Sequence, residues 1–313
     1  MPLPPQLDGR LKLPAVAAPM FLTSGPDLVV ETCKAGLLGT FPALNQRTTE
    51  GYDAWLSEIE GRLENADCGD RPGPAPFGIN LIVHRTNTRV EADLKITVAH
   101  KVPLVITSLG AVRDVVDAVH SYGGLVFHDV INLRHAEKAV EAGVDGIIAV
   151  CAGAGGHAGT LSPFALVPEI KRIFDGTVVL SGALSAGAHI AAARMIGADM
   201  AYFGTRFIAT KEGAAPEDYK QMILDGRAAD IVYTPSVSRV AGSFLRESIA
   251  TAGLDPDNMP PPGEMEVGQQ EMRAWKNIWS AGQGIGSISD VPSTSDLCAR
   301  LVEEYRTAMA KIT

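Results

Sequence analysis

The chain has 313 residues, of which 46% are hydrophobic and 20% are charged, as expected of a globular protein with a large core. Its formal net charge of -9 and its lack of a Lys/Arg run argue against a nucleic-acid partner, and no apolar stretch is long enough to cross a membrane. The first residues do not resemble a secretory signal, and the four cysteines are spaced too widely to predict disulfides or zinc, so we expect a cytoplasmic protein.

Short apolar runs alternate with helical patterns from the N-terminus to about residue 203. The predicted strands are residues 14–20, 37–41, 77–83, 104–107, 125–128, 146–150, 178–180 and 200–203. The helices predicted between them are residues 27–35, 52–64, 91–100, 112–122, 133–142, 161–173 and 186–196. This order predicts parallel neighbours joined by crossovers, and therefore an α/β protein with a (β/α)8 TIM barrel. An open doubly wound sheet is the alternative, because periodicity alone does not distinguish a closed sheet from an open one.

The pattern changes after Thr210, where Pro-rich and charged segments begin and no clean strand is evident. We therefore predict that residues 10–212 and 280–313 form the barrel. Residues 213–279 are predicted to be a helical insertion that forms a small substrate domain, and a last helix is expected at about residues 295–310.

A glycine-rich loop follows the sixth predicted strand and contains a histidine. Gly153, Gly155, Gly156 and Gly159 allow positive φ and let a flat or anionic ligand approach the backbone, with His157 held over that ligand. With an unperturbed pKa near 6.5, His157 would be suited to take up a proton near neutral pH. The alternative is an ordinary strand-to-helix connection with a solvated histidine.

Ligands of a TIM barrel bind at the carboxyl ends of its strands, so the residues after each strand are the candidate site. The loops after the last two strands, with Ser181, Gly182, Ala183, Gly204 and Thr205, offer backbone N–H groups and hydroxyls to a phosphate. The alternative is that Ser181 and Ser185 cap the helix expected to begin there.

Other conspicuous residues have more ordinary interpretations. His128, His135 and His189 show no metal-ligand spacing, and we predict no metal site. Arg206 is suited equally to a phosphate or to a nearby acid. A homodimer is compatible with the sequence, although no self-complementary apolar stripe stands out.

Several segments together resemble the nitronate monooxygenase family, formerly called 2-nitropropane dioxygenases. They are Ala18-Pro-Met20, Asn80, Gly155-Gly-His-Ala-Gly159, Val179-Leu-Ser-Gly-Ala183, Phe203-Gly-Thr-Arg-Phe207 and Trp279-Ser-Ala-Gly-Gln-Gly284. The resemblance implies an FMN-binding TIM barrel with a helical substrate domain. Similar proteins include NADH:quinone reductases and enoyl-acyl carrier reductases, so the resemblance leaves the reaction open.

The resemblance also implies roles for individual residues. His157 would be catalytic and face the substrate, and the FMN phosphate would lie on the backbones of Gly182, Ala183, Gly204 and Thr205. Met20 and Asn80 would lie near the flavin ring, and Gln283 would reach it. The full set expected to bind the cofactor is Ala18, Pro19, Met20, Asn80, His128, Gly156, Ser181, Gly182, Ala183, Gly204, Thr205 and Gln283.

Two departures from the family pattern are visible. Ala183 stands where relatives often have glycine, and an N–H donor remains there. His128-Asp129 stands where some relatives carry a lysine, and an acid at Asp129 changes the electrostatic field beside the flavin.

The expected activity is that of an FMN-dependent monooxygenase that oxidises alkyl nitronates or nitroalkanes with O2. The alternative is an NAD(P)H-dependent reductase of an enone, enoyl thioester or quinone. A phosphate-ligand binder without flavin is the third interpretation. All three expect a small-molecule ligand.

Overall fold

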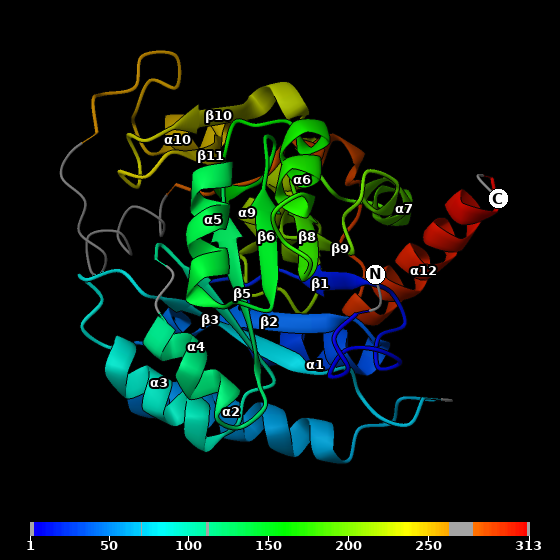
Figure 1. The fold of residues 1–313 in the computed structure, drawn as a ribbon. Helices are drawn as coiled ribbons and strands as arrows, with labels where there is room; N and C mark the ends of the chain where they lie inside the picture. Colours follow the sequence, from blue (N-terminus) through cyan, green and yellow to red (C-terminus); the bar gives the residue numbers. More distant parts are fainter. Residues whose placement is uncertain (1–2, 70, 111–112, 263–277, 312–313) are drawn as a thin grey trace.

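The computed structural model describes residues 3–69, 71–110, 113–262 and 278–311. Within these residues a closed parallel barrel forms the centre of the molecule (Figure 1). Its strands, in spatial order, are β1 (Ala15–Ala17), β2 (Leu38–Pro42), β3 (Phe77–Ile82), β4 (Leu104–Ser108), β5 (Leu125–Val130), β6 (Gly146–Val150), β8 (Thr177–Ser181) and β9 (Met200–Phe203).

The barrel closes where β1 pairs in parallel with β9, with Val16 opposite Tyr202. This closure confirms the (β/α)8 prediction and excludes the open doubly wound sheet. β6 and β8 are buried along their whole length, because the barrel interior covers one face of each strand and the outer helices cover the other. Because both faces of these strands are buried, their sequences are continuous apolar runs such as Gly146–Val150.

Helices connect the barrel strands within a few residues of the predicted positions. They are α1 (Pro26–Ala35), α2 (Thr49–Glu64), α3 (Val90–Ala99), α4 (Arg113–His120), α5 (Leu133–Ala142), α6 (Pro163–Lys171) and α7 (Gly187–Met195). Position 112, the predicted start of the fourth of these helices, lies outside the described residues. After β9 come α8 (Thr205–Ile208) and α9 (Glu217–Asp225), and the last helix, α12 (Thr294–Ala310), packs against α7 and α1.

The insertion contains strands, so the expectation of none was wrong. β10 (Ile231–Thr234) and β11 (Gly242–Leu245) pair antiparallel and precede α10 (Arg246–Thr251). β11 also pairs with β7 (Gly156–His157), which comes from the glycine-rich loop. Strands of two to four residues are too short to give a recognisable alternation. Residues 263–277 of the predicted insertion lie outside the described part of the chain.

Arg206 pairs with an acid, which was one of the two interpretations of this residue. Its Nη1 lies 3.2 Å from Asp290 Oδ1, and its Nη2 donates to the Asp290 and Ala209 carbonyls at 2.8 and 2.7 Å. The buried guanidinium therefore ties α8 to the returning C-terminal segment. Of the helices in the described residues, none has the length and apolar character that spanning a bilayer requires.

Candidate active site

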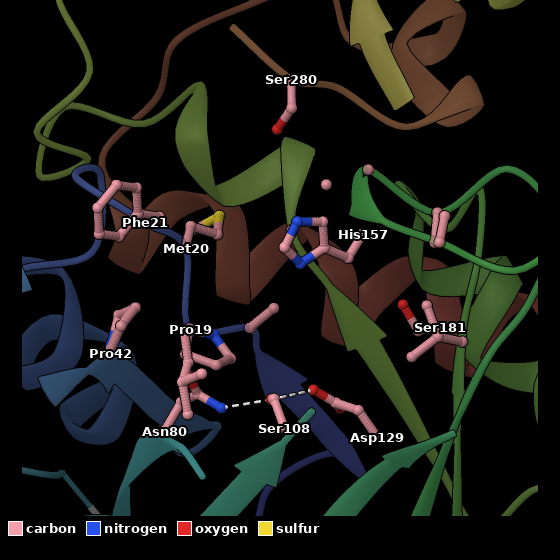
Figure 2. A pocket seen from close by; sticks show the side chains of 18 of the residues that line it. Pro19, Met20, Phe21, Pro42, Asn80, Ser108, Asp129, His157, Ser181 and Ser280 are labelled. Atoms are coloured by element: carbon pink, nitrogen blue, oxygen red, sulfur yellow. Dashed lines mark hydrogen bonds between the residues drawn. The ribbon is translucent and has the colours of Figure 1, made fainter. Parts of the chain in front are cut away.

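A cavity of about 1660 Å³ opens at the carboxyl ends of the barrel strands. It brings together most of the predicted residues: Ala18, Pro19, Met20, Asn80, His128, Gly156, His157, Ser181, Gly182, Ala183, Gly204 and Thr205 all line it. Figure 2 shows Met20, Asn80 and Ser181 around this pocket, with His157 among them. Gln283 is the exception. Its side chain is exposed, it does not line the cavity, and its backbone N–H donates to the Gly153 carbonyl at 2.9 Å.

The glycine-rich loop connects the barrel to the insertion. Gly153 and Gly156 have positive φ, as predicted, whereas Gly155 and Gly159 do not. Gly155 is required for a different reason, because a Cβ there would lie 2.8 Å from the backbone nitrogen of Gly282. His157 pairs with Gly242 of β11, so this small sheet holds its position. The histidine is half-buried and lines the cavity, which rules out the solvated interpretation.

Burial lowers the pKa of His157 to about 4. The unperturbed pKa of 6.5 therefore does not apply to His157, because removing the imidazolium from water disfavours the charged form. At neutral pH the imidazole is uncharged. It can accept a proton or a hydrogen bond, but it does not act as a positive partner for an anion.

A chain of hydrogen bonds joins the ends of three neighbouring strands. Asn80 Nδ2 donates to the Ile106 carbonyl at 3.1 Å and to Ser108 Oγ at 2.7 Å. Ser108 Oγ in turn donates to Asp129 Oδ2 at 2.6 Å, as the dashed lines in Figure 2 show. Sequence reasoning did not assign Ser108 to the cofactor site, although its place directly at the end of β4 was the available signal.

His128 is buried next to this series of hydrogen bonds. Its Nδ1 lies 2.7 Å from Thr107 Oγ1, and burial lowers the pKa of His128 to about 4. Like His157, this residue is neutral at pH 7, so a hydrogen bond rather than a charge holds it against β4.

The loop after β8 does not begin a helix, which corrects the expectation for residues 181–185. α7 starts at Gly187, its N-cap residue is Ala186, and no side chain caps it. Ser185 Oγ instead lies 2.6 Å from Ser287 Oγ. The capping interpretation of Ser181 and Ser185 therefore does not hold, and this loop stays open to the cavity.

The backbone of this loop is tightly constrained. Gly182 has φ of 146°, and a Cβ there would lie 2.8 Å from the Ala152 carbonyl oxygen. The N–H of Ala183 donates to the Gly153 carbonyl at 3.1 Å, so it is already engaged. On the neighbouring loop, Thr205 Oγ1 accepts a hydrogen bond from the Gly282 N–H at 2.8 Å. Gly182, Gly204 and Thr205 line the cavity at these two loops.

The residues that line the cavity include more basic than acidic side chains, unlike the chain as a whole. Asp129 is the one carboxylate among its described lining residues, whereas Arg47, Arg89 and Lys138 also line it. Arg89 is paired with Asp93 at 2.9 Å. This balance suits an anionic ligand and contrasts with the formal net charge of -9 for the whole chain.

Residues of the insertion complete the cavity. Sequence reasoning named Trp279 only as part of the segment 279–284, and it did not single out Tyr219 or Tyr233. Tyr219 and Trp279 stack with their ring centroids 4.9 Å apart, and both line the pocket together with Tyr233. Aromatic side chains can provide an apolar wall for a flat ligand. No local pattern distinguishes these aromatic residues from ordinary core residues.

The neutral histidines predict a loss of stability in acid. His128 has a folded pKa near 4 and an ordinary unfolded value of 6.5, so the unfolded chain binds more protons between these pH values. The free energy of unfolding should fall as pH drops from 6.5 towards 4, by about 3 kcal/mol in total from this residue. Urea unfolding at pH 7 and pH 5 should show a smaller drop for His128→Asn than for the wild type. The exposed His120, as His120→Asn, is the control, and equal drops in all three proteins would contradict the prediction.

Known proteins resemble this chain along most of its length. The family model described as nitronate monooxygenase matches residues 8–304. A nitronate monooxygenase of Paraburkholderia phytofirmans is 26% identical, over 96% of this chain and 94% of that protein. An octahydro-indene-carboxyl-CoA dehydrogenase of Rhodococcus jostii is 27% identical, over 77% of this chain and 65% of that protein. The structure of a nitroalkane oxidase from Streptomyces ansochromogenes has a TM-score of 0.83 at 22% identity, covers 98% of this chain and 100% of that chain, and shares the fold.

Proposed function

The chain belongs to the nitronate monooxygenase family and is an oxidoreductase, and from that premise we propose that it uses FMN to oxidise alkyl nitronates with O2. The observation that carries the proposal is one cavity that combines two kinds of lining. A glycine-lined cradle at Gly182 and Gly204 is suited to a phosphate, and a neutral imidazole, His157, lines the same space.

The residues present fit FMN. A Cβ at position 182 would collide with the Ala152 carbonyl, so packing requires a glycine there. At Gly204 the nearest atom of the described residues to a Cβ is Met20 Sδ at 3.9 Å, and both glycines line the cavity without a side chain that would keep a phosphate away. Ala18, Pro19, Met20 and Asn80 would contact the ring, which supplies the site for electron transfer and reaction with O2. A cavity of about 1660 Å³ exceeds the roughly 300–1,000 Å³ of a typical ligand pocket, which leaves room for a substrate beside the cofactor.

The low pKa of His157 favours a nitronate over the neutral nitroalkane as substrate. A nitroalkane must first lose a proton from carbon, and an imidazole whose conjugate acid has a pKa of about 4 is a weak base for that step. A nitronate arrives without that proton, and Arg47 and Lys138 along the cavity attract its charge. His157 would then hydrogen-bond the bound substrate, and with nitroalkanes it would accept the carbon proton.

An NAD(P)H-dependent reductase of an enone, enoyl thioester or quinone is the second candidate. The size of the cavity favours a larger substrate, and one relative is named for a carboxyl-CoA substrate. In this reaction His157 would supply a proton to the reduced substrate. Burial lowers the pKa of His157, so the protonated imidazolium would be costly to form before that transfer.

The colour of the purified protein and its anaerobic reduction distinguish these functions. We expect a yellow protein whose flavin absorbance is bleached rapidly by propionate 3-nitronate and only slowly by NADH or NADPH, because the first is the proposed electron donor. Rapid bleaching by NADPH alone would favour the reductase. A colourless protein that does not take up added FMN would refute flavin chemistry altogether.

A further inference from the structure

Asp129 occupies an unusual position for a carboxylate. It lines the cavity, and Ser108 Oγ donates to its Oδ2 at 2.6 Å. Its second oxygen, Oδ1, is buried and has no hydrogen-bond partner among the residues that the structure describes. A carboxylate in which only one oxygen is stabilised in this way is costly, because the buried oxygen carries part of the charge without a hydrogen bond from the described residues.

The direction of the hydrogen-bond chain decides which oxygen would carry a proton. The Asn80 amide is a donor to both the Ile106 carbonyl and Ser108 Oγ, so the Ser108 hydroxyl hydrogen is free to point at Asp129. Oδ2 therefore accepts, and the proton of a neutral Asp129 lies on Oδ1. The hydrogen bonds from Asn80 to Ser108 and from Ser108 to Asp129 can therefore form whether Asp129 is ionised or neutral.

Among the described residues, no lysine, arginine or histidine forms a salt bridge with Asp129. Tyr202 faces it from β9, and burial together with the Asp129 charge raises the pKa of Tyr202 well above its usual value. His128 on the same strand and His157 from the glycine-rich loop are neutral, and His135 and Lys138 line the cavity from α5. Burial raises the pKa of Asp129 to about 6, and the Ser108 hydrogen bond opposes that shift only in part.

We propose that Asp129 is a redox-linked proton site, which binds a proton from solvent when the flavin in this cavity is reduced. The inference rests on the proposed function. Above pH 6 the oxidised enzyme holds Asp129 as a carboxylate. A bound flavin that has taken up two electrons from a reductant and one proton from solvent would add one negative charge to this cavity. Asp129 would then bind a second proton from solvent, because two negative charges in one cavity repel each other.

The midpoint potential of the holoenzyme against pH tests this proposal. A two-electron couple changes by about 30 mV per pH unit for each proton taken up. Between pH 7 and 8.5 we expect about 60 mV per pH unit for the wild type and about 30 mV for Asp129→Asn, which is nearly isosteric and uncharged. Glu137→Gln, an exposed neutralisation on α5, should keep the wild-type slope.

A spectroscopic titration gives a second readout that does not depend on turnover. The flavin spectrum of the oxidised wild type should shift with an apparent pKa near 6, and Asp129→Asn should abolish that shift. Ser108→Ala should move the transition to higher pH, because it removes the hydrogen bond that stabilises the carboxylate. Equal slopes and an unchanged transition in Asp129→Asn with bound flavin would overturn the proposal and leave the FMN assignment intact. A wild-type protein unable to bind FMN would refute both.

Discussion

Replacing His157 with asparagine is expected to lower turnover of a neutral nitroalkane by about 10²- to 10⁴-fold, the usual range for loss of a general base. Asparagine keeps a polar side chain of similar reach but does not accept the carbon proton. Because burial holds the pKa of His157 near 4, kcat/KM of the wild type should stay flat as pH falls through 6.5 and decline only near pH 4. Steady-state rates of the flavin-loaded protein between pH 4 and 8 measure both effects.

This experiment has two controls, a variant of a second histidine and a second substrate. His120→Asn changes a histidine that is paired with Asp145 outside the cavity, and it should leave turnover unchanged. With a preformed nitronate the effect of His157→Asn should be much smaller, since no carbon proton is removed. Equal losses with both substrates would show that His157 binds the substrate and does not act as a base.

Replacing Gly182 with valine is expected to weaken FMN binding by about 100-fold or more. The added side chain would have to adopt φ near 146° and would place Cβ within 2.8 Å of the Ala152 carbonyl oxygen. Relief of that clash would move the backbone that we propose to bind the phosphate, and a strain of about 3 kcal/mol corresponds to roughly a hundredfold in affinity. Quenching of flavin fluorescence on titration of the apoprotein measures the dissociation constant.

Gly61→Ala is the control for Gly182→Val. Gly61 lies in α2, and outside the neighbouring helix backbone no atom of the described residues lies within 4 Å of its Cβ position. That variant should bind FMN like the wild type, and circular dichroism of both proteins should report an unchanged fold. Wild-type affinity in Gly182→Val would exclude this loop as the phosphate site.

The sequence alone determined the order of the barrel's strands and helices, whereas the pairing of β1 with β9 showed that the sheet is closed. Each parallel strand is buried on both faces, so runs such as those at residues 146–150 and 178–180 stand out locally as continuous apolar segments. The glycine-rich loop was visible for a similarly local reason. Glycines clustered after a strand mark a backbone that makes close approaches, and the structure brings Gly155 against Gly282.

Only the tertiary structure decided how these parts act together. β7 pairs with β11, more than eighty residues later in the chain, and no local pattern encodes a partner at that distance. Likewise, the low pKa of His157 and the raised pKa of Asp129 depend on burial by side chains from several elements. A sequence specifies which groups can ionise, whereas the surrounding packing sets the cost of ionising them, and that cost exists only once the chain has folded.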